Sequence, residues 1–518
     1  MAHQPSTEPP SAAAEENAVA KQSAPIASTD LPVSRWGWPL LQALRHDALQ
    51  AWASIHQSGD AVQTRIMDRT MHFLFHPTLV RSVLMQDEQA FVKEGGQTAV
   101  FKVVQGVNVL TTRGTNWKRQ RRILGPAFSA RRVSDYMALM MQAARDVNLS
   151  LLPQQTGESR VLNVGDYATR VTMDVILRVL FSQRMPPEHV QGVSDSVRQL
   201  SMQGMRMLFW PFIPPAWFPY PGRRATVRSQ RLLGSLIGAH IAARRRANKA
   251  LPADASQDLL GVMLASEDET SADTADALRR LSTQEVEDNC MALFLAGHDT
   301  SATAITWWMG LMATHPAAAA RARQEVFAAL GPTPCDVAMT PAHLMRMPWL
   351  EATLKEAMRL RPPITAPFMR KAQQDVAMHG VVIRAGEVVS MPIWQMHHDP
   401  RWFPEPEAFR PERFMPGAPE IPRGAWMPFG TGPHVCIGQH FAMVEMTLLA
   451  ALLLAQVRWA FEPGDDLPAP RLDIVLKPER PMRLRVWRES DGTNCAIRQV
   501  SQRADQRWPF ASCLGWST

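Results

Sequence analysis

A short glycine-rich segment near the C-terminal end carries the residue whose type and setting point most directly to chemistry. Its spacing is Phe-x-x-Gly-x-x-x-Cys-x-Gly, and the fixed positions are Phe429, Gly432, Cys436 and Gly438. A helix is expected just after the cysteine, and the N–H groups and positive charge of a helix N-terminus favour a thiolate. The glycines allow a tight turn beside the sulfur, and Phe429 is expected to shield it from water. The loop is suited to presenting a metal ligand, although a lone cysteine is more often a small buried apolar residue.

A second candidate is the polar pair Asp299 and Thr300 inside the apolar stretch 291–313. Polar groups in such a helix are costly to bury unless they have partners or a task. A carboxylate and a hydroxyl together can deliver protons, and the small residues Ala296 and Gly297 leave room for a planar cofactor beside the helix. The alternative is that the Thr300 hydroxyl bonds only to its own helix. The relay is the favoured interpretation, because ionisable groups in apolar helices are usually functional.

A basic helix is expected to start near residue 114, with Trp117 and Arg121 four residues apart on one face. A Trp N–H and an Arg fork together suit a carboxylate. A solvated basic helix is the usual outcome of such a run, so the signal is weak alone. The remaining cations, Lys118, Arg119 and Arg122, are candidates for docking an acidic protein, and an ordinary solvated surface is the alternative.

A third group of charges is interpreted as structural. Glu356 and Arg359 lie three apart on an expected helix whose neighbours are apolar, so the pair is expected to be buried. A buried pair needs further partners, and Arg413 is available from a Pro-Glu-Arg-Phe segment.

Together these motifs, in this order, resemble the cytochrome P450 family. The resemblance covers roughly residues 32–489 and implies a mainly α fold with a smaller β-rich part. It implies haem b as the cofactor, Cys436 as the iron ligand, and Ala296, Gly297, Phe429 and Gly438 beside the haem. The residues that it implies around the haem propionates are Trp117, Arg121, Arg370 and His434. At position 434 the family usually has Arg, and the shorter His titrates near neutral pH.

The activity implied by the resemblance is a monooxygenase that hydroxylates or epoxidises an apolar substrate with O2, two electrons and two protons. Asp299 and Thr300 are expected to deliver the protons. No flavin- or nicotinamide-binding region follows the cysteine loop, so we expect electrons from a separate ferredoxin or flavodoxin with its reductase. An apolar segment rich in Met and aromatic residues, 200–221, favours a lipid, terpenoid or polyketide-like substrate. The alternatives are a non-catalytic haem sensor and an isomerase or dehydratase on the same fold.

The composition sets wider limits. The chain has 518 residues, of which 46% are hydrophobic, and a net charge of +7, which is too mild to indicate nucleic acid. Its five cysteines lack CxxC spacing, which argues against a disulfide framework and suits a reducing cytoplasm. We expect a disordered lead over 1–31, without a signal or membrane anchor, and a C-terminal extension of unknown role over 490–518. A cytoplasmic protein of bacterial type is therefore expected.

Overall fold

The computed structural model describes residues 28–30, 37–184, 187–208, 218–248, 258–265 and 280–488. Most of the expected N-terminal lead, the C-terminal extension and residues 209–217 of the Met-rich segment lie outside them. Ser28–Asp30, at the end of the expected lead, forms strand β1 and pairs in parallel with β2. Sheet pairing therefore begins earlier in the chain than the expected boundary at residue 31.

The fold is mainly helical, as predicted. The α-helices are α2 (Trp38–His46), α3 (Ala48–His56), α4 (Pro77–Met85), α5 (Gly95–Gln105), α6 (Gly114–Leu124), α7 (Ala130–Leu151), α8 (Val164–Phe181), α9 (Pro187–Leu208), α10 (Arg223–Asn248), α11 (Leu259–Ala265), α13 (Thr283–Thr314), α14 (Pro316–Leu330), α15 (Pro341–Met345), α16 (Pro348–Leu360), α17 (Ile393–His397) and α18 (Gln439–Gln456). The 3-10 helices are η1 (Gly125–Phe128), η3 (Pro334–Asp336) and η4 (Pro411–Phe414).

The smaller β-rich part is also as predicted, and its largest sheet has the order β1-β2-β3-β9-β6-β4. A second sheet has the order β10-β13-β5, and β7-β8 and β11-β12 are separate two-stranded sheets. The strands are β2 (Ala61–Ile66), β3 (Arg69–Leu74), β4 (Phe91–Lys93), β5 (Ser159–Asn163), β6 (Arg370–Ala372), β7 (Val376–Met378), β8 (Val381–Ile383), β9 (Val388–Ser390), β10 (Arg458–Ala460), β11 (Pro470–Leu472), β12 (Leu476–Pro478) and β13 (Arg483–Trp487).

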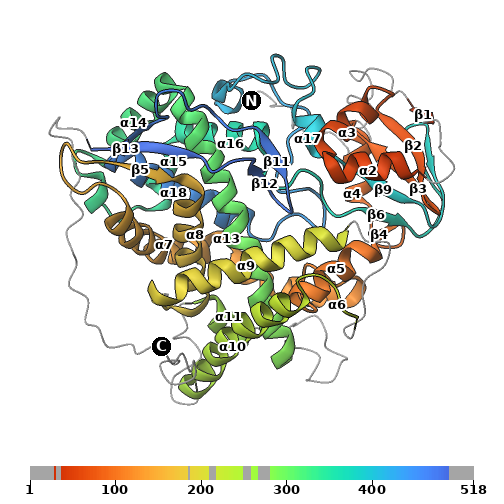
Figure 1. Cartoon of the computed structure of the whole chain (residues 1–518), viewed down its shortest axis with the longest axis horizontal. Helices are drawn as coiled ribbons and strands as arrows, with labels where there is room; N and C mark the ends of the chain where they lie inside the picture. The colour runs from red at the N-terminus through yellow and green to blue at the C-terminus, as the bar shows by residue number, and fades with distance from the viewer. Residues whose placement is uncertain are drawn as a thin grey trace, which may run out of the picture.

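Helix α13 runs through the middle of the molecule, while the six-stranded sheet lies with α2, α3 and α4 at one side (Figure 1). Ser282 and Glu285 begin the helix with a reciprocal capping box. Its C-terminal half is buried on all sides, with Trp307 and Trp308 fully buried. It packs on α8, α16 and α18, so side chains in its middle are fixed relative to the helix that follows the cysteine loop.

Helix α18 begins just after the cysteine loop and is apolar around most of its circumference. Among the described residues, α18 is the one helix that is long and apolar enough to cross a membrane, with a mean hydropathy of 1.3. However, 78% of it is buried inside the fold. The apolar stretch 291–313 noted in the sequence forms part of α13. Burial on all sides explains the apolar composition of α18.

Candidate active site

The cysteine loop is held by its own backbone. The Cys436 N–H donates to the Phe429 carbonyl at 2.9 Å. Gly432 has φ +75°, and a Cβ there would lie 2.2 Å from the Leu84 carbonyl oxygen, so only glycine fits. Gly438 differs from the expectation of a tight turn: its φ is −90°, and it serves as the residue before the first turn of α18.

The Cys436 side chain is exposed although α18, which follows it, is buried. Surrounding protein removes enough water to raise the pKa of the thiol, while the Gly438 N–H and the Arg121 guanidinium lower the pKa. The loop alone therefore favours the thiol. A metal that binds the sulfur would displace its proton, since a coordinated thiol is deprotonated.

Trp117 and His434 pack against each other, with ring centroids 3.8 Å apart. Trp117 is buried on α6, and Arg121, four residues later on the same helix, donates to the Val435 carbonyl at 2.8 Å. Burial and the nearby cations Lys93, Arg370 and Arg121 lower the pKa of His434 to about 3. His434 is therefore neutral at pH 7 in this arrangement.

Beside the cysteine loop lies a cation cluster, which consists of the buried Lys93 and Arg370 and the half-buried Arg121. Lys93 on β4 and Arg370 on β6 are directly paired across the sheet, so their like charges face each other. The Lys93 Nζ donates to the Leu110 carbonyl at 2.8 Å, and the Arg370 Nη1 to the Phe368 carbonyl at 2.6 Å. Burial is the main reason that the pKa of Lys93 falls to about 7 and that of Arg370 to about 10.

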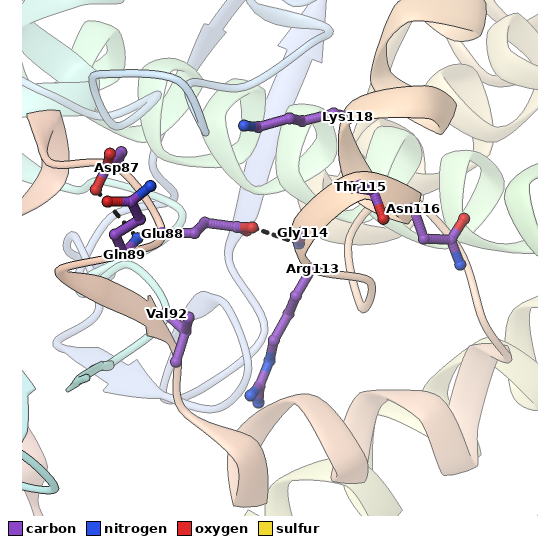
Figure 2. A pocket seen from close by; sticks show the side chains of 9 residues that line it. All are labelled: Asp87, Glu88, Gln89, Val92, Arg113, Gly114, Thr115, Asn116 and Lys118. Carbon is purple, nitrogen blue, oxygen red and sulfur yellow. Dashed lines mark hydrogen bonds between the residues drawn. The ribbon is translucent and has the colours of Figure 1, made fainter. Parts of the chain in front are cut away.

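The Glu88 carboxylate raises the pKa values of Lys93 and Arg370 in this cluster, and it lies at the side of a groove of 470 Å³. Figure 2 shows its side chain reaching across the groove to the first residue of α6, Gly114, whose N–H it accepts. Its other oxygen, Oε1, lies 3.5 Å from the His434 Nε2. That oxygen and the His434 Nδ1 are buried without hydrogen-bond partners. One carboxylate therefore interacts with two of these cations, Lys93 and Arg370, and with the imidazole of His434.

On α13, Ala296 is exposed within an otherwise packed region, as expected for a residue beside a cofactor. Gly297 lies instead against α8, where a Cβ would meet the Ile176 Cδ1 at 3.3 Å. The small size of Gly297 thus lets α13 and α8 approach closely, whereas the sequence had assigned it to the cofactor side.

The acid–alcohol pair is on the same stretch of α13. The Thr300 hydroxyl donates to the Ala296 carbonyl at 2.8 Å, which is the bond to its own helix that was the alternative interpretation. The Asp299 Oδ1 lies 3.2 Å from the Nζ of Lys477 on β12. In this structure, therefore, the two side chains are bonded to other partners and not to each other.

The charges interpreted as structural do come together. Glu356 and Arg359 are fully buried and make two parallel bonds, at 2.7 and 2.8 Å. Arg413 on η4 reaches the Glu356 Oε1 at 3.4 Å, and the Arg410 N–H donates to the same oxygen at 2.9 Å. Arg359 also donates to the carbonyls of residues 397, 406 and 408. We call these residues the Glu356 network.

Lys118, Arg119 and Arg122, the three cations predicted as candidates for docking an acidic protein, differ in their surroundings. Arg119 forms an ion pair with Glu285 and donates to the Arg280 carbonyl, so it is committed within the fold. Lys118 and Arg122 are exposed, and Lys118 lies along the groove in Figure 2.

The family profile that matches this chain is that of cytochrome P450, over residues 32–486. The chain belongs to the cytochrome P450 family. A putative cytochrome P450 132 of Mycobacterium bovis is 30% identical over 79% of this chain and 86% of its own length. Cyclooctatin synthase of Streptomyces melanosporofaciens is 29% identical over 88% of this chain and 94% of its own. Retinoic acid-bound cyanobacterial CYP120A1 superposes with a TM-score of 0.73 at 26% identity, over 90% and 99% of the two chains.

Membership establishes the cofactor and the class of reaction. Cytochromes P450 bind haem b through a cysteine thiolate, and this protein is a cytochrome P450 monooxygenase. The cation cluster fits this cofactor. Haem b carries two propionates. Among the described residues, Lys93 and Arg370 donate hydrogen bonds to backbone carbonyls, and buried cations of this kind match anionic groups supplied by a ligand.

Two polar residues of the site had not been singled out in the sequence. Lys93 joins the cluster only through the pairing of β4 with β6, and no local motif marks it. Glu445 on α18 is fully buried; burial raises its pKa to about 8, and a hydrogen bond with Ser301 of α13 lowers it. A glutamate inside an apolar helix is a signal that sequence reasoning can use, since such a group needs a partner.

Proposed function

We propose that this cytochrome P450 inserts one oxygen atom of O2 into an apolar organic substrate, by hydroxylation or epoxidation. The overall reaction converts RH, O2, two electrons and two protons into ROH and water. The observation that carries the assignment of residues is the cation cluster beside the exposed thiol of Cys436. It supports a site in which the chain supplies one anionic ligand and cations for two propionates.

Cys436 is the proposed iron ligand, and its thiolate would raise the electron density at the metal. Arg121, Arg370 and Lys93 would bind the propionates, and Trp117 would hold the His434 ring in place beside them. Bound haem supplies the iron at which O2 is activated. Burial would make these charge-assisted contacts strong, because water does not compete with them.

Asp299 is the proposed carrier of protons from solvent towards the oxygen site, with the Thr300 hydroxyl as the next group. Asp299 is partly exposed, with 14% of its side chain accessible, so it is able to exchange protons with water. The Thr300 hydroxyl can donate a hydrogen bond only after it turns away from the Ala296 carbonyl.

The proposed substrate is a lipid-like or terpenoid-like molecule. Phe101 and Phe368 form an edge-to-face pair, with ring centroids 5.0 Å apart. Ile474 and Val104 lie against Gly204 of α9, and together these side chains offer apolar surface on α5, α9 and the β11–β12 strand pair. The names of two similar proteins support this class, since one was solved with retinoic acid and another is a cyclooctatin synthase.

The electrons are proposed to come from a separate ferredoxin or flavodoxin with its reductase. Lys118 is the proposed contact for an acidic donor, because it is exposed on α6 beside the groove, whereas Arg119 is already paired.

The test begins with the reduced, carbon monoxide-bound protein, whose absorbance should show the band of a thiolate-ligated haem. Cys436→Ala should abolish the band. A screen for shifts of the Soret band with retinoic acid, fatty acids and cyclic terpene alcohols should then identify ligands. ¹⁸O from ¹⁸O2 should appear in the product when surrogate redox proteins are supplied. Retention of the band in Cys436→Ala would overturn the ligand assignment, and turnover of hydroperoxides without electrons would instead indicate an isomerase or dehydratase.

A further inference from the structure

Helix α10 carries exposed arginines along one face. Its sequence contains seven arginines and neither Asp nor Glu. Arg224, Arg228 and Arg231 follow one another at intervals of four and three residues, so they lie on the same side of the helix. All three are exposed, and none of them forms an ion pair within the part of the chain that the structure describes. We call these three residues the arginine row.

Further arginines extend this positive surface at both ends of the row. Arg206, near the end of α9, is exposed, and its Nη1 would lie 3.8 Å from a Cβ on Gly222, the residue just before α10. Arg245 is also exposed, and it lies about four helical turns, or roughly 21 Å, beyond Arg231. The exposed face of α10 is therefore positive near both of its ends.

Small residues occupy this face between the two groups of arginines. Ser235 and Ala242 are exposed, and a Cβ on Gly234 would meet no atom within 4 Å. The leucines and isoleucines of the same stretch, 232–242, pack into the core instead. A helix that binds in a lipid surface presents large apolar side chains to it. Small residues between arginines suit contact with another protein better than insertion into lipid.

The arginine row lies beside the elements that carry the proposed substrate surface. Helix α10 packs on α9 (Figure 1), and the Gln230 amide donates to the Val103 carbonyl of α5. The next residue of α5, Val104, lies with Ile474 against Gly204 of α9. A protein bound on α10 would therefore be next to α5 and α9. The groove that contains Lys118 is a separate surface, because residues between 87 and 118 line it.

We propose that the arginine row is the docking site of an acidic helical protein that delivers the substrate as a tethered acyl chain. This inference rests on the proposed function, because it identifies who brings the apolar substrate to the same site. An apolar chain is poorly soluble in water, so a carrier has a clear use. Carboxylates along one helix of the carrier would pair with the row, since each guanidinium can bind a carboxylate through two hydrogen bonds.

Docking on the row changes no covalent bond. The acyl chain stays joined to its carrier while an oxygen atom is inserted, so the arginines act in binding and orientation alone. Complementary charges mainly speed association, and salt weakens their effect. The positive net charge of the chain, +7, also favours an acidic partner.

The test uses the haem-loaded full chain and a labelled acyl carrier protein, a small acidic helical protein, loaded with a hexadecanoyl chain. Fluorescence anisotropy measures its binding, and a shift of the Soret band reports entry of the chain. The wild type should bind the loaded carrier, with an affinity that falls as ionic strength rises. Vesicles of phosphatidylserine, without the carrier, test whether the row instead meets a membrane surface.

The triple variant Arg224→Gln/Arg228→Gln/Arg231→Gln should bind the carrier roughly tenfold or more weakly, because three ion pairs at the interface are lost. The corresponding triple variant with Lys keeps the charges and should retain most of the affinity. Free hexadecanoic acid should shift the Soret band equally in the wild type and in both variants, since the row does not contact the apolar region.

The matched control removes three exposed arginines elsewhere, through Arg45→Gln/Arg65→Gln/Arg384→Gln. It lowers the net charge by the same amount and should leave carrier binding within about twofold of the wild type. Equal loss of binding in the two Gln variants would overturn the inference, because net charge and not the row would then govern association.

Two further outcomes would overturn the docking site. Vesicles that bind through the row, with no binding of the carrier, would identify a membrane surface as its partner. If free hexadecanoic acid shifts the Soret band but the loaded carrier does not bind, the docking site is wrong and the proposed function stands. If the reduced, carbon monoxide-bound protein lacks the thiolate band, the proposed function fails, and anisotropy still decides the docking site by itself.

Discussion

Two of the buried groups of charges in the part of the chain that the structure describes differ in composition. The Glu356 network contains its own carboxylate, and Arg359 donates to that carboxylate and to three backbone carbonyls. In the cation cluster of Lys93, Arg121 and Arg370, the Glu88 carboxylate acts on Lys93 and Arg370, and the hydrogen bonds of the three cations run to backbone carbonyls. One group is complete within the chain, and the other has an excess of positive charge.

The difference indicates what each group does. A buried ion pair with all its hydrogen bonds made is costly to break, so it holds elements of the fold in register. An excess of buried cations is unfavourable by itself. Burial accordingly lowers the pKa of Lys93 to about 7 and the pKa of Arg370 to about 10. Such a group suits a binding site for an anion, and the anions that we propose for it are the haem propionates.

The largest effect on stability is expected in the Glu356 network. Glu356→Ala leaves Arg359 charged and buried without its carboxylate, which should lower the free energy of unfolding by about 3–5 kcal/mol. Urea unfolding of the haem-loaded protein measures this loss. The matched control is Glu405→Gln, which removes an exposed pair with Arg410 and should change stability by less than about 1 kcal/mol. Equal effects of the two variants would contradict the distinction.

In the cation cluster, a substitution should weaken haem retention without weakening the apoprotein. Arg370→Met removes charge-assisted bonds to a propionate, each of which contributes about 1.5–3 kcal/mol, so haem should be lost roughly 10–100 times faster. Transfer of haem to a scavenging protein measures the rate. The apoprotein should be as stable as the wild type or more so, because one of two facing like charges is gone. An equal loss of stability with and without haem would show that Arg370 belongs to a structural network.

The pH dependence of the apoprotein sharpens the same comparison. Burial lowers the pKa of Lys93 from 10.5 to about 7, so between these values the unfolded chain binds more protons than the folded chain. Stability should therefore rise with pH above 7, by at most about 1.4 kcal/mol over the first unit. Below pH 7 the penalty is complete and constant. Chemical unfolding at several pH values should show this rise in the wild type and its absence in Lys93→Met.

The smallest effect is expected for Arg413→Met. Its bond to Glu356 is long, at 3.4 Å, and Glu356 keeps its two bonds to Arg359 and the N–H of Arg410. Stability should fall by about 1 kcal/mol, with the carbon monoxide-difference spectrum unchanged. A loss as large as that of Glu356→Ala would mean that Arg413 is an essential member of the network.

Much of the site was predictable because its signals are local. Helical spacing placed Trp117 and Arg121 on one face, and the Glu356–Arg359 pair was expected to be buried. Local reasoning also allowed two outcomes for Thr300, and the bond to its own helix is the one present. The sequence assigned Gly297 to the cofactor side, but its size serves the contact with Ile176. A pattern in one helix does not say which neighbour each face will meet.

By itself, the sequence determined the family, the cysteine loop, the helix that follows it and the apolar central helix, because spacing and periodicity are properties of neighbouring residues. Only the tertiary structure decided which charges meet. The pairing of β4 with β6 places Lys93 opposite Arg370, and the packing of β12 on α13 brings Lys477 to Asp299. Charge balance in a buried site depends on the distance between segments remote in sequence, and that distance exists only after the chain has folded.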